Sequence, residues 1–225
     1  MIDVQALVLS VRLAVVVSLA LLVIGLPLAY WLAQSRWRWK FLVESVVALP
    51  LVLPPTVLGF YVLLAIGAQS PIGTIWSRWF GQGLAFTFEG LAIASVLYSL
   101  PFAVQPFTAA FSQVDRKLLE ASAILGASPW RTFRRVMLPL STNGIVTGIV
   151  LSFAHTIGEF GVVVMVGGNI PGVTRTVSVA IYDDVQALNF ARANATALLL
   201  FVFSGLVLAL VYALNHRVWS VQPEI

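Results

Sequence analysis

The 225-residue sequence contains no cysteine and only two histidines. Without cysteine the chain can form no disulfide, no thiolate metal site and no cysteine nucleophile, and two histidines are too few for an ordinary zinc cluster. Charged residues are scarce as well, at 10% of the chain against about 25% in soluble domains. We therefore expect this chain to hold no metal and no cofactor.

Hydrophobic residues, in contrast, make up 60% of the chain, against roughly 45–50% in soluble domains. The formal net charge is only +4, and a nucleic-acid-binding protein would carry such a charge on a much more polar chain. The composition therefore indicates a protein of the lipid bilayer and excludes nucleic acid as a partner.

A membrane-spanning helix needs about 20 mainly apolar residues. Five stretches meet this requirement, at about residues 10–35, 43–67, 90–112, 141–166 and 193–215. No basic leader precedes the first stretch and no small-residue cleavage site follows it, so we expect no removable signal peptide. The sequence predicts an all-α membrane protein with a single transmembrane domain, residues 1–225, and five transmembrane helices.

The loops between these stretches differ in their content of Lys and Arg. One set holds nine such residues, in the loops after the first and third stretches and at the C-terminus, whereas the other set holds four: Arg12, Arg78, Arg175 and Arg192. Because Lys and Arg near span ends stay in the cytoplasm, we expect the N-terminus outside and the C-terminus inside. The protein would then be a multi-pass protein of the cytoplasmic (inner) membrane.

Prolines are unusually frequent within the predicted spans. Six of the eleven prolines lie there: Pro27, Pro50, Pro54, Pro55, Pro101 and Pro106. Each removes a backbone donor and bends its helix. Two interpretations stay open, namely kinks that only shape helix packing, and a flexible gate in the run at residues 49–55, which includes Pro54 and Pro55.

Two short helices are expected outside the spans. At residues 70–80, Ser70 is placed to cap a helix that has Pro71 at its first position, and apolar residues follow at helical spacing. At residues 115–125 a helix-forming run ends at Gly126, a residue that can adopt positive φ. Ser128 and Pro129 then have the pattern of a helix start.

The predicted cytoplasmic loop, residues 112–140, therefore holds two helices joined at a glycine. From spacing alone, this pair is either a docking element or a helix pair resting on lipid headgroups. In the second case Arg131, Arg134 and Arg135 would be attracted to anionic lipid.

The residues of this loop resemble a known motif. Glu120, Ala121 and Ser122 are followed after three residues by Gly126, and Leu138 and Pro139 come twelve residues beyond that glycine. The spacing resembles the EAA loop of permease subunits of ATP-binding cassette (ABC) importers, with Ser122 replacing an alanine and Val136 an isoleucine. The resemblance implies that the first loop helix docks on an ATPase subunit and transmits its closure to the spans.

Three other runs resemble the molybdate branch of these permeases. They are L-P-L-V-L-P-P-T-V-L-G-F at residues 49–60, G-E-F-G at 158–161 and N-I-P-G-V-T-R-T at 169–176. The second run also occurs in sulfate and thiosulfate permeases, so an importer of those anions is the alternative.

This resemblance implies a type I ABC importer permease fold and transport of molybdate, with tungstate carried almost equally. The implied partners are a second copy of the chain, two ATPase subunits, and a periplasmic or lipid-anchored molybdate-binding protein.

Polar residues of the fourth span allow more than one role. Gly144, Gly148, Ser152 and Thr156 recur every four residues and form one narrow face. This face suits close helix packing, although Ser152, Thr156 and Glu159 could instead line a translocation path.

His155 and Glu159 share a helix face. We expect a structural contact, either between these two side chains or from Glu159 to the backbone, rather than the proton relay of a secondary anion carrier.

The outer loop at residues 167–194 carries Arg175, Asp183 and Asp184 beside an amphipathic stretch at 177–185. It is either a solvated cap or, as the resemblance implies, the surface that contacts the binding protein. The chain cannot hydrolyse ATP through a P-loop, because its two lysines, Lys40 and Lys117, do not follow glycine. ATP hydrolysis would therefore reside in a separate subunit, and this chain is not an enzyme.

Overall fold

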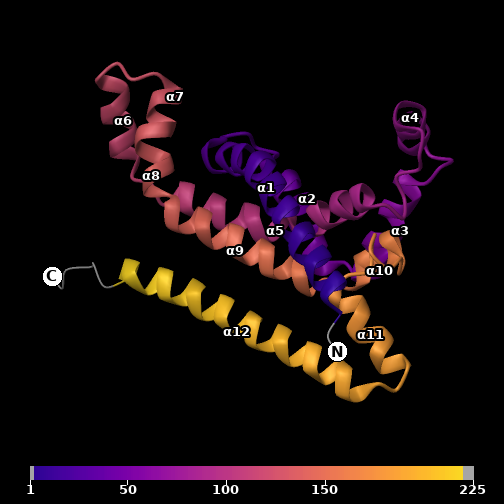
Figure 1. Ribbon diagram of the computed structural model, residues 1–225. Coiled ribbons are helices and arrows are strands. Elements are labelled where there is room, and N and C mark those ends of the chain that lie inside the picture. Colours follow the sequence, from indigo (N-terminus) through magenta and orange to yellow (C-terminus); the bar gives the residue numbers. More distant parts are fainter. Residues whose placement is uncertain (1–2, 220–225) are drawn as a thin grey trace.

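The computed structural model describes residues 3–219, and side chains up to residue 213. The described residues form helices and no strand (Figure 1). In chain order the helices are α1 (Val4–Gln34), α2 (Lys40–Val52), α3 (Pro55–Ile66), α4 (Pro71–Phe80), α5 (Phe88–Ser112), α6 (Arg116–Ile124), α7 (Pro129–Thr132), the π-helix η1 (Phe133–Met137), α8 (Leu138–Leu140), α9 (Thr142–Gly158), α10 (Gly161–Gly167), α11 (Val177–Gln186) and α12 (Phe190–Trp219).

Three helices, α1, α5 and α12, are each long and apolar enough to cross a membrane. Two further pairs pass the same test only as bent units: α2 with α3, bent by 115°, and the segment Pro129–Leu140 with α9, bent by 70°. The predicted second span, residues 43–67, therefore consists of two helices that meet at a sharp bend. Within the predicted fourth span, residues 141–166, α9 ends at Gly158 and α10 begins at Gly161.

The break between α2 and α3 follows from two consecutive prolines. Leu53 and Pro54 have extended backbones, with ψ of 137° and 135°, as expected for residues that precede proline. Pro55 then occupies the first position of α3, where a missing N–H costs little. Single prolines act differently: Pro27, Pro50, Pro101 and Pro106 lie inside continuous helices.

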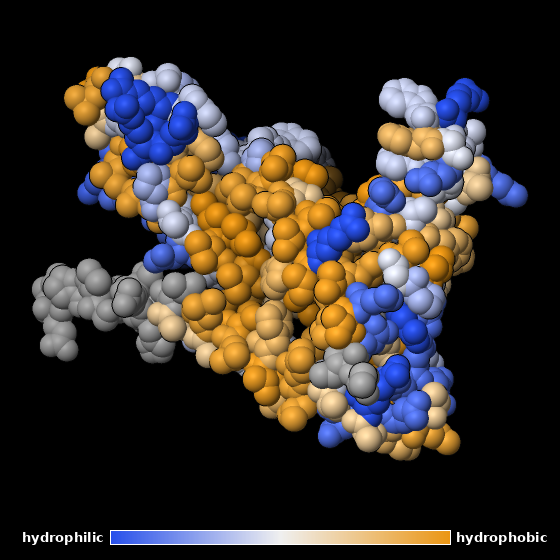
Figure 2. All heavy atoms as spheres, viewed as in Figure 1, coloured by the Kyte–Doolittle hydropathy of each residue, from blue (hydrophilic) through white to orange (hydrophobic). Residues whose placement is uncertain are grey.

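The loops and helix ends lie toward two opposite ends of the molecule (Figure 1). Helices α6 to α8 lie at the same end of the molecule as the C-terminal end of α12, whereas α4, α11 and the start of α1 lie toward the other end. Hydrophobic residues cover most of the middle of the molecule, and hydrophilic residues gather toward these two ends (Figure 2). The loops predicted to be cytoplasmic therefore share one end, while the orientation itself stays a prediction.

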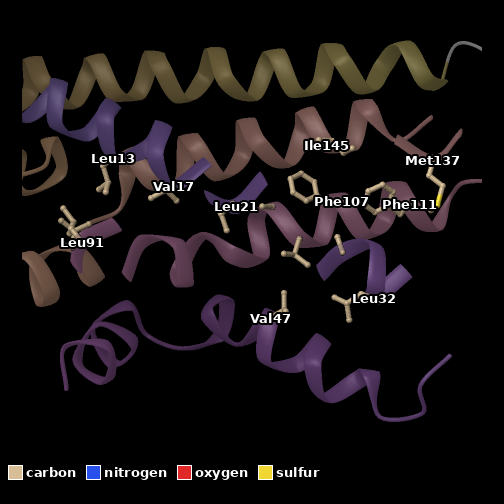
Figure 3. Packing of buried hydrophobic residues seen from close by; sticks show 14 of the residues in the cluster. Leu13, Val17, Leu21, Leu32, Val47, Leu91, Phe107, Phe111, Met137 and Ile145 are labelled. Carbon is tan, nitrogen blue, oxygen red and sulfur yellow. The ribbon is translucent and has the colours of Figure 1, made fainter. Parts of the chain in front are cut away.

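Helices α1, α5 and α9 pack together around the main hydrophobic core (Figure 3). Its largest fully buried side chains include Phe107, Phe111, Leu13 and Leu21. A Cβ atom at Gly148 would lie 2.6 Å from Cε1 of Phe107, and one at Gly144 would lie 2.4 Å from Cβ of Ala110. The small-residue face of α9 therefore packs directly on α5, which favours the packing interpretation of that face.

Candidate functional site

The loop between α5 and α9 has the two predicted helices. The Asp115 carboxylate caps α6 by accepting a hydrogen bond from the Lys117 N–H at 2.9 Å. Gly126 ends this helix in the left-handed conformation, with φ of +74°. Ser128 caps α7 through the Arg131 N–H at 3.3 Å, and Pro129 takes the first helical position. The sequence signals for these turns are confirmed.

Helix α6 presents an exposed surface at the end of the molecule. Glu120 is exposed, and the apolar side chains of Ile124 and Leu125 are each 86% exposed. Large apolar side chains at the tip of a polar end are typical of a surface that another protein covers. The residues Glu120, Ala121 and Ser122 therefore lie on a helix with an exposed, partly apolar surface.

A side-chain hydrogen bond connects α6 to the next helix. Ser122 Oγ lies 2.8 Å from Thr132 Oγ1 at the end of α7. From α7 the chain continues through η1 and α8, where Met137 is buried in the main core and Leu138 and Pro139 lead into α9. Helix α6 is therefore connected through α7 and η1 to the core helices.

The two helix breaks meet in space. A Cβ atom at Gly161, the first residue of α10, would lie 2.6 Å from Cβ of Pro55, the first residue of α3. A Cβ at Gly59 would lie 2.8 Å from Cβ of Met165, so α3 and α10 pack closely. The predicted gate residue Pro55 thus lies inside a tight junction, whereas Pro54 beside it is exposed.

Glu159 holds this junction from the α9 side. Its Oε1 accepts a hydrogen bond from the Val162 N–H at 2.8 Å, and its backbone carbonyl accepts one from the Ser178 hydroxyl. The side chain is buried. The expected contact from Glu159 to the backbone is confirmed, and this carboxylate satisfies a donor at the start of α10 that would otherwise have no partner.

His155 does not contact Glu159. Its Nδ1 lies 3.0 Å from Ser99 Oγ, and its ring stacks on Phe102 with centroids 3.9 Å apart. Ser99 in turn lies 3.0 Å from the Thr156 hydroxyl. The alternative of a contact between the His155 and Glu159 side chains is therefore wrong.

The hydroxyl side chains expected to line a path are buried between helices. Thr156 donates to the Ser152 carbonyl at 2.8 Å, and both residues are at most 1% exposed. Thr156 contacts Ser99 of α5 through its hydroxyl, so this part of α9 serves helix packing. The reason is the close approach of α5 that Gly144 and Gly148 allow.

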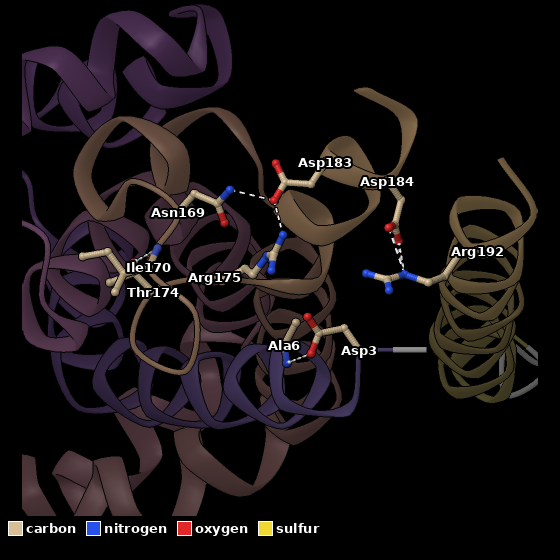
Figure 4. A network of polar contacts seen from close by, with 9 residues as sticks. All are labelled: Asp3, Ala6, Asn169, Ile170, Thr174, Arg175, Asp183, Asp184 and Arg192. Carbon is tan, nitrogen blue, oxygen red and sulfur yellow. Dashed lines mark hydrogen bonds and ion pairs between the residues drawn. The ribbon is translucent and has the colours of Figure 1, made fainter. Parts of the chain in front are cut away.

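The outer loop carries a network of charges (Figure 4). Asp183 pairs with Arg175 and accepts a hydrogen bond from Asn169 Nδ2 at 2.6 Å, while Asp184 pairs with Arg192 at 2.9 Å. Asp184 is buried, whereas Asp183 remains partly exposed. The Asp184 carboxylate therefore joins α11 to α12, and Asp183 and Arg175 are the more accessible of the predicted contact residues.

Several partners in these contacts were not singled out from the sequence. Ser99, Thr132 and Ser178 each contact a predicted site residue, namely Thr156, Ser122 and Glu159. Isolated Ser and Thr residues have no spacing pattern that would reveal a distant partner. The sequence identified Arg192 only as one of the positive charges in the predicted outer loops, and its pairing with Asp184 was not predicted.

Residues 25–220 match the family described as binding-protein-dependent transport system inner membrane component. The chain belongs to this family. It is 50% identical over 212 residues to the molybdenum transport system permease protein ModB of Azotobacter vinelandii, covering 94% of this chain and 93% of that protein. ModB of Escherichia coli strain K12 is 40% identical over 182 residues, 81% of this chain and 80% of that one.

A more distant relative is the probable sulfate transport system permease protein cysT of Chlorella vulgaris. It is 31% identical over 220 residues, which cover 96% of this chain and 82% of that protein. The identities to the two ModB proteins, 50% and 40%, are higher than the 31% identity to cysT. This order agrees with the molybdate branch that the sequence motifs indicate.

Solved structures confirm the fold of this permease. The inward-facing MetNI methionine ABC transporter superposes with a TM-score of 0.72 at 19% identity, covering 97% of this chain and 95% of that chain. A bacterial alginate ABC transporter superposes with a TM-score of 0.68 at 17% identity, covering 95% and 77%. The predicted type I ABC importer permease fold and the inner-membrane location are therefore correct.

Proposed function

We propose that the chain is the membrane-spanning subunit of an ATP-driven importer of molybdate. The observation that carries this proposal is the 50% identity to ModB of Azotobacter vinelandii over nearly the whole of both chains. Tungstate would be carried almost equally, because the two tetrahedral dianions have nearly the same size and charge. The lower identity of the sulfate relative makes sulfate the second candidate.

In this proposal the energy for transport comes from two ATPase subunits that dock at α6. Glu120, Leu125 and neighbouring exposed residues would enter a groove on the ATPase. Closure of the ATPase pair would move α6, and the bond between Ser122 and Thr132 would carry the movement to α7 and on to α9. The segment Pro129–Leu140 meets α9 at a bend of 70°. A movement of this segment along the membrane surface would therefore tilt α9 within the membrane.

The path itself would form between two copies of the chain. Within one protomer Ser152 and Thr156 are buried, and the Thr156 hydroxyl contacts Ser99 of α5. Apolar side chains such as Tyr61 on α3 and Phe201 on α12 are 65% and 77% exposed, and some of this surface would pack on the second copy. Pro54 is exposed at the break in the second span and would lie near the gate.

On the outer side, a periplasmic or lipid-anchored molybdate-binding protein would deliver the anion. The partly exposed pair of Arg175 and Asp183 would contribute to its docking surface. Charges at the rim of an interface fix the relative orientation of the two proteins and their association rate more than their affinity. Affinity for molybdate would reside in the binding protein.

Cells that lack this chain test the substrate. We expect them to lose molybdoenzyme activity at limiting molybdate and to regain it with excess molybdate that enters through other anion carriers. Growth on sulfate as the sole sulfur source should stay normal. A sulfur requirement with intact molybdoenzymes would move the chain to the sulfate branch and leave the fold untouched.

A further inference from the structure

A groove of about 480 Å³ lies between α1 and the segment from α7 to α8. Its wall is almost entirely apolar and is formed by residues of these two segments. They are Leu22, Val23, Leu26, Pro27 and Tyr30 of α1, with Pro129, Trp130, Phe133 and Leu138 opposite. The groove lies apart from the exposed tip of α6, from the outer loop and from the junction of α3 and α10.

The π-helix η1 shapes one wall of this groove. The Leu138 N–H donates to the carbonyl of Phe133, five residues earlier. A hydrogen bond between residues five apart brings Phe133 and Leu138 onto the same face of the helix. In an α-helix these two residues would lie on different faces. Both side chains therefore face α1, and Trp130 stacks on Phe133 with ring centroids 5.6 Å apart.

The groove opens onto the exposed apolar side of α1. Val23 in its wall is 72% exposed, and Leu19 one turn earlier is 58% exposed. These residues lie in the middle of a helix that is long and apolar enough to cross a membrane, and their exposed apolar surface suits contact with hydrocarbon. A flexible apolar chain from the bilayer can enter the groove sideways.

Positive charge lies beside the apolar wall. The Arg134 guanidinium carbon is 5.8 Å from the centroid of the Trp130 ring. Arg131 and Arg135 are exposed on the same short segment, and none of the three forms an ion pair with a residue that the structure describes. The groove thus combines an apolar slot for a hydrocarbon chain with unpaired cations at its edge.

We propose that this groove binds an anionic phospholipid, with one acyl chain between α1 and η1 and the headgroup phosphate at Arg134. A lipid fits both features, because the slot is continuous with the hydrocarbon-facing side of α1 and the cations suit an anionic headgroup. The ATPase would dock at the exposed tip of α6, which is separate from this sideways opening. The lipid would thereby contact both α1 and the coupling segment.

Fluorescence quenching by brominated lipid tests this proposal, because bromine on an acyl chain quenches nearby tryptophan. The full chain is placed in nanodiscs of phosphatidylcholine containing a minor fraction of dibrominated phosphatidylglycerol or dibrominated phosphatidylcholine. The difference between the wild-type chain and Trp130→Phe isolates the signal of Trp130 among the seven tryptophans. We expect the Trp130 signal to be quenched more strongly by the brominated anionic lipid.

Two substitutions and one matched control locate the site. Arg134→Gln should lower the preference for phosphatidylglycerol about fivefold, while Arg116→Gln on α6 removes the same charge from the same loop and should leave it unchanged. Val23→Phe, at an exposed position, should fill the groove and reduce quenching by both lipids.

Equal quenching by the two brominated lipids, or equal effects of Arg134→Gln and Arg116→Gln, would overturn the proposal. Absence of Trp130 quenching would overturn it as well, since a second copy or another subunit would then cover the groove. None of these readouts depends on the transported anion, so they are independent of the proposed substrate.

Discussion

Pro55 lies directly against Gly161 at the point where the two broken helices meet. The pyrrolidine ring occupies the space that a side chain at position 161 would need, since a Cβ there would lie 2.6 Å from Pro55 Cβ. Glu159 fixes the same junction by accepting the Val162 N–H. Two features that are separate in the sequence, a double proline and a glycine-flanked glutamate, therefore form one packed unit.

Substitution of Gly161 by alanine should strain this unit. The added methyl group must displace Pro55, and overpacking of this kind costs about 1–3 kcal/mol. Gly158→Ala is the matched control, because a Cβ at Gly158 meets nothing within 4 Å. Thermal unfolding of the purified chain should show a lower midpoint for Gly161→Ala alone. Equal midpoints for the two variants would argue against the packed junction.

Two substitutions of Glu159 separate a structural role from a proton relay. Glu159→Gln keeps an oxygen that can accept the Val162 N–H, so stability and transport should stay near the wild-type values. Glu159→Ala leaves this buried donor without its partner, at a cost of about 1–3 kcal/mol. Thermal unfolding and molybdate uptake are measured on both variants. Loss of uptake in a stable Glu159→Gln variant would favour a titrating carboxylate.

The turn at Gly126 should tolerate few side chains. Its φ of +74° is disfavoured for a β-branched residue by about 1–2 kcal/mol, so Gly126→Val should disturb the relation of α6 to α7. Gly126→Asn is the control, because asparagine adopts this conformation more readily. We expect Gly126→Val, and likewise Glu120→Lys on the docking face, to insert in the membrane but to lose ATP-driven uptake. Normal uptake by both would argue that the loop rests on lipid without coupling.

The absence of cysteine allows a direct test of orientation. Single cysteines are introduced at Arg38, between α1 and α2, and at Gln82, after α4, which are both exposed. Intact cells are treated with a membrane-impermeant thiol reagent. Only the Gln82 variant should react, and both should react once the membrane is opened. Labelling of the Arg38 variant in intact cells would reverse the proposed orientation.

The sequence sufficed for features that depend on neighbours along the chain. The caps at Ser70 and Ser128 and the positive φ of Gly126 were all predicted, because each depends on a few adjacent residues. The two short helices of the loop at residues 112–140 were likewise predicted from neighbouring residues.

Features that depend on long-range packing were not predicted. Hydropathy stays high across Pro54 and across Glu159, so it could not distinguish a continuous span from two helices. Likewise, the pairing of Asp184 with Arg192 and of His155 with Ser99 depends on how distant segments meet. The sequence likewise left open whether Ser152 and Thr156 line a path or serve helix packing, since their burial results from the approach of α5.

Uptake by reconstituted vesicles tests the central claim most directly. The chain is assembled with its ATPase subunits in proteoliposomes, and the binding protein is supplied outside with radiolabelled molybdate and ATP inside. We expect uptake that requires ATP and the binding protein, that is competed by tungstate, and that is insensitive to equimolar sulfate. Uptake of sulfate in preference to molybdate, or uptake driven by a proton gradient without ATP, would contradict the proposed function.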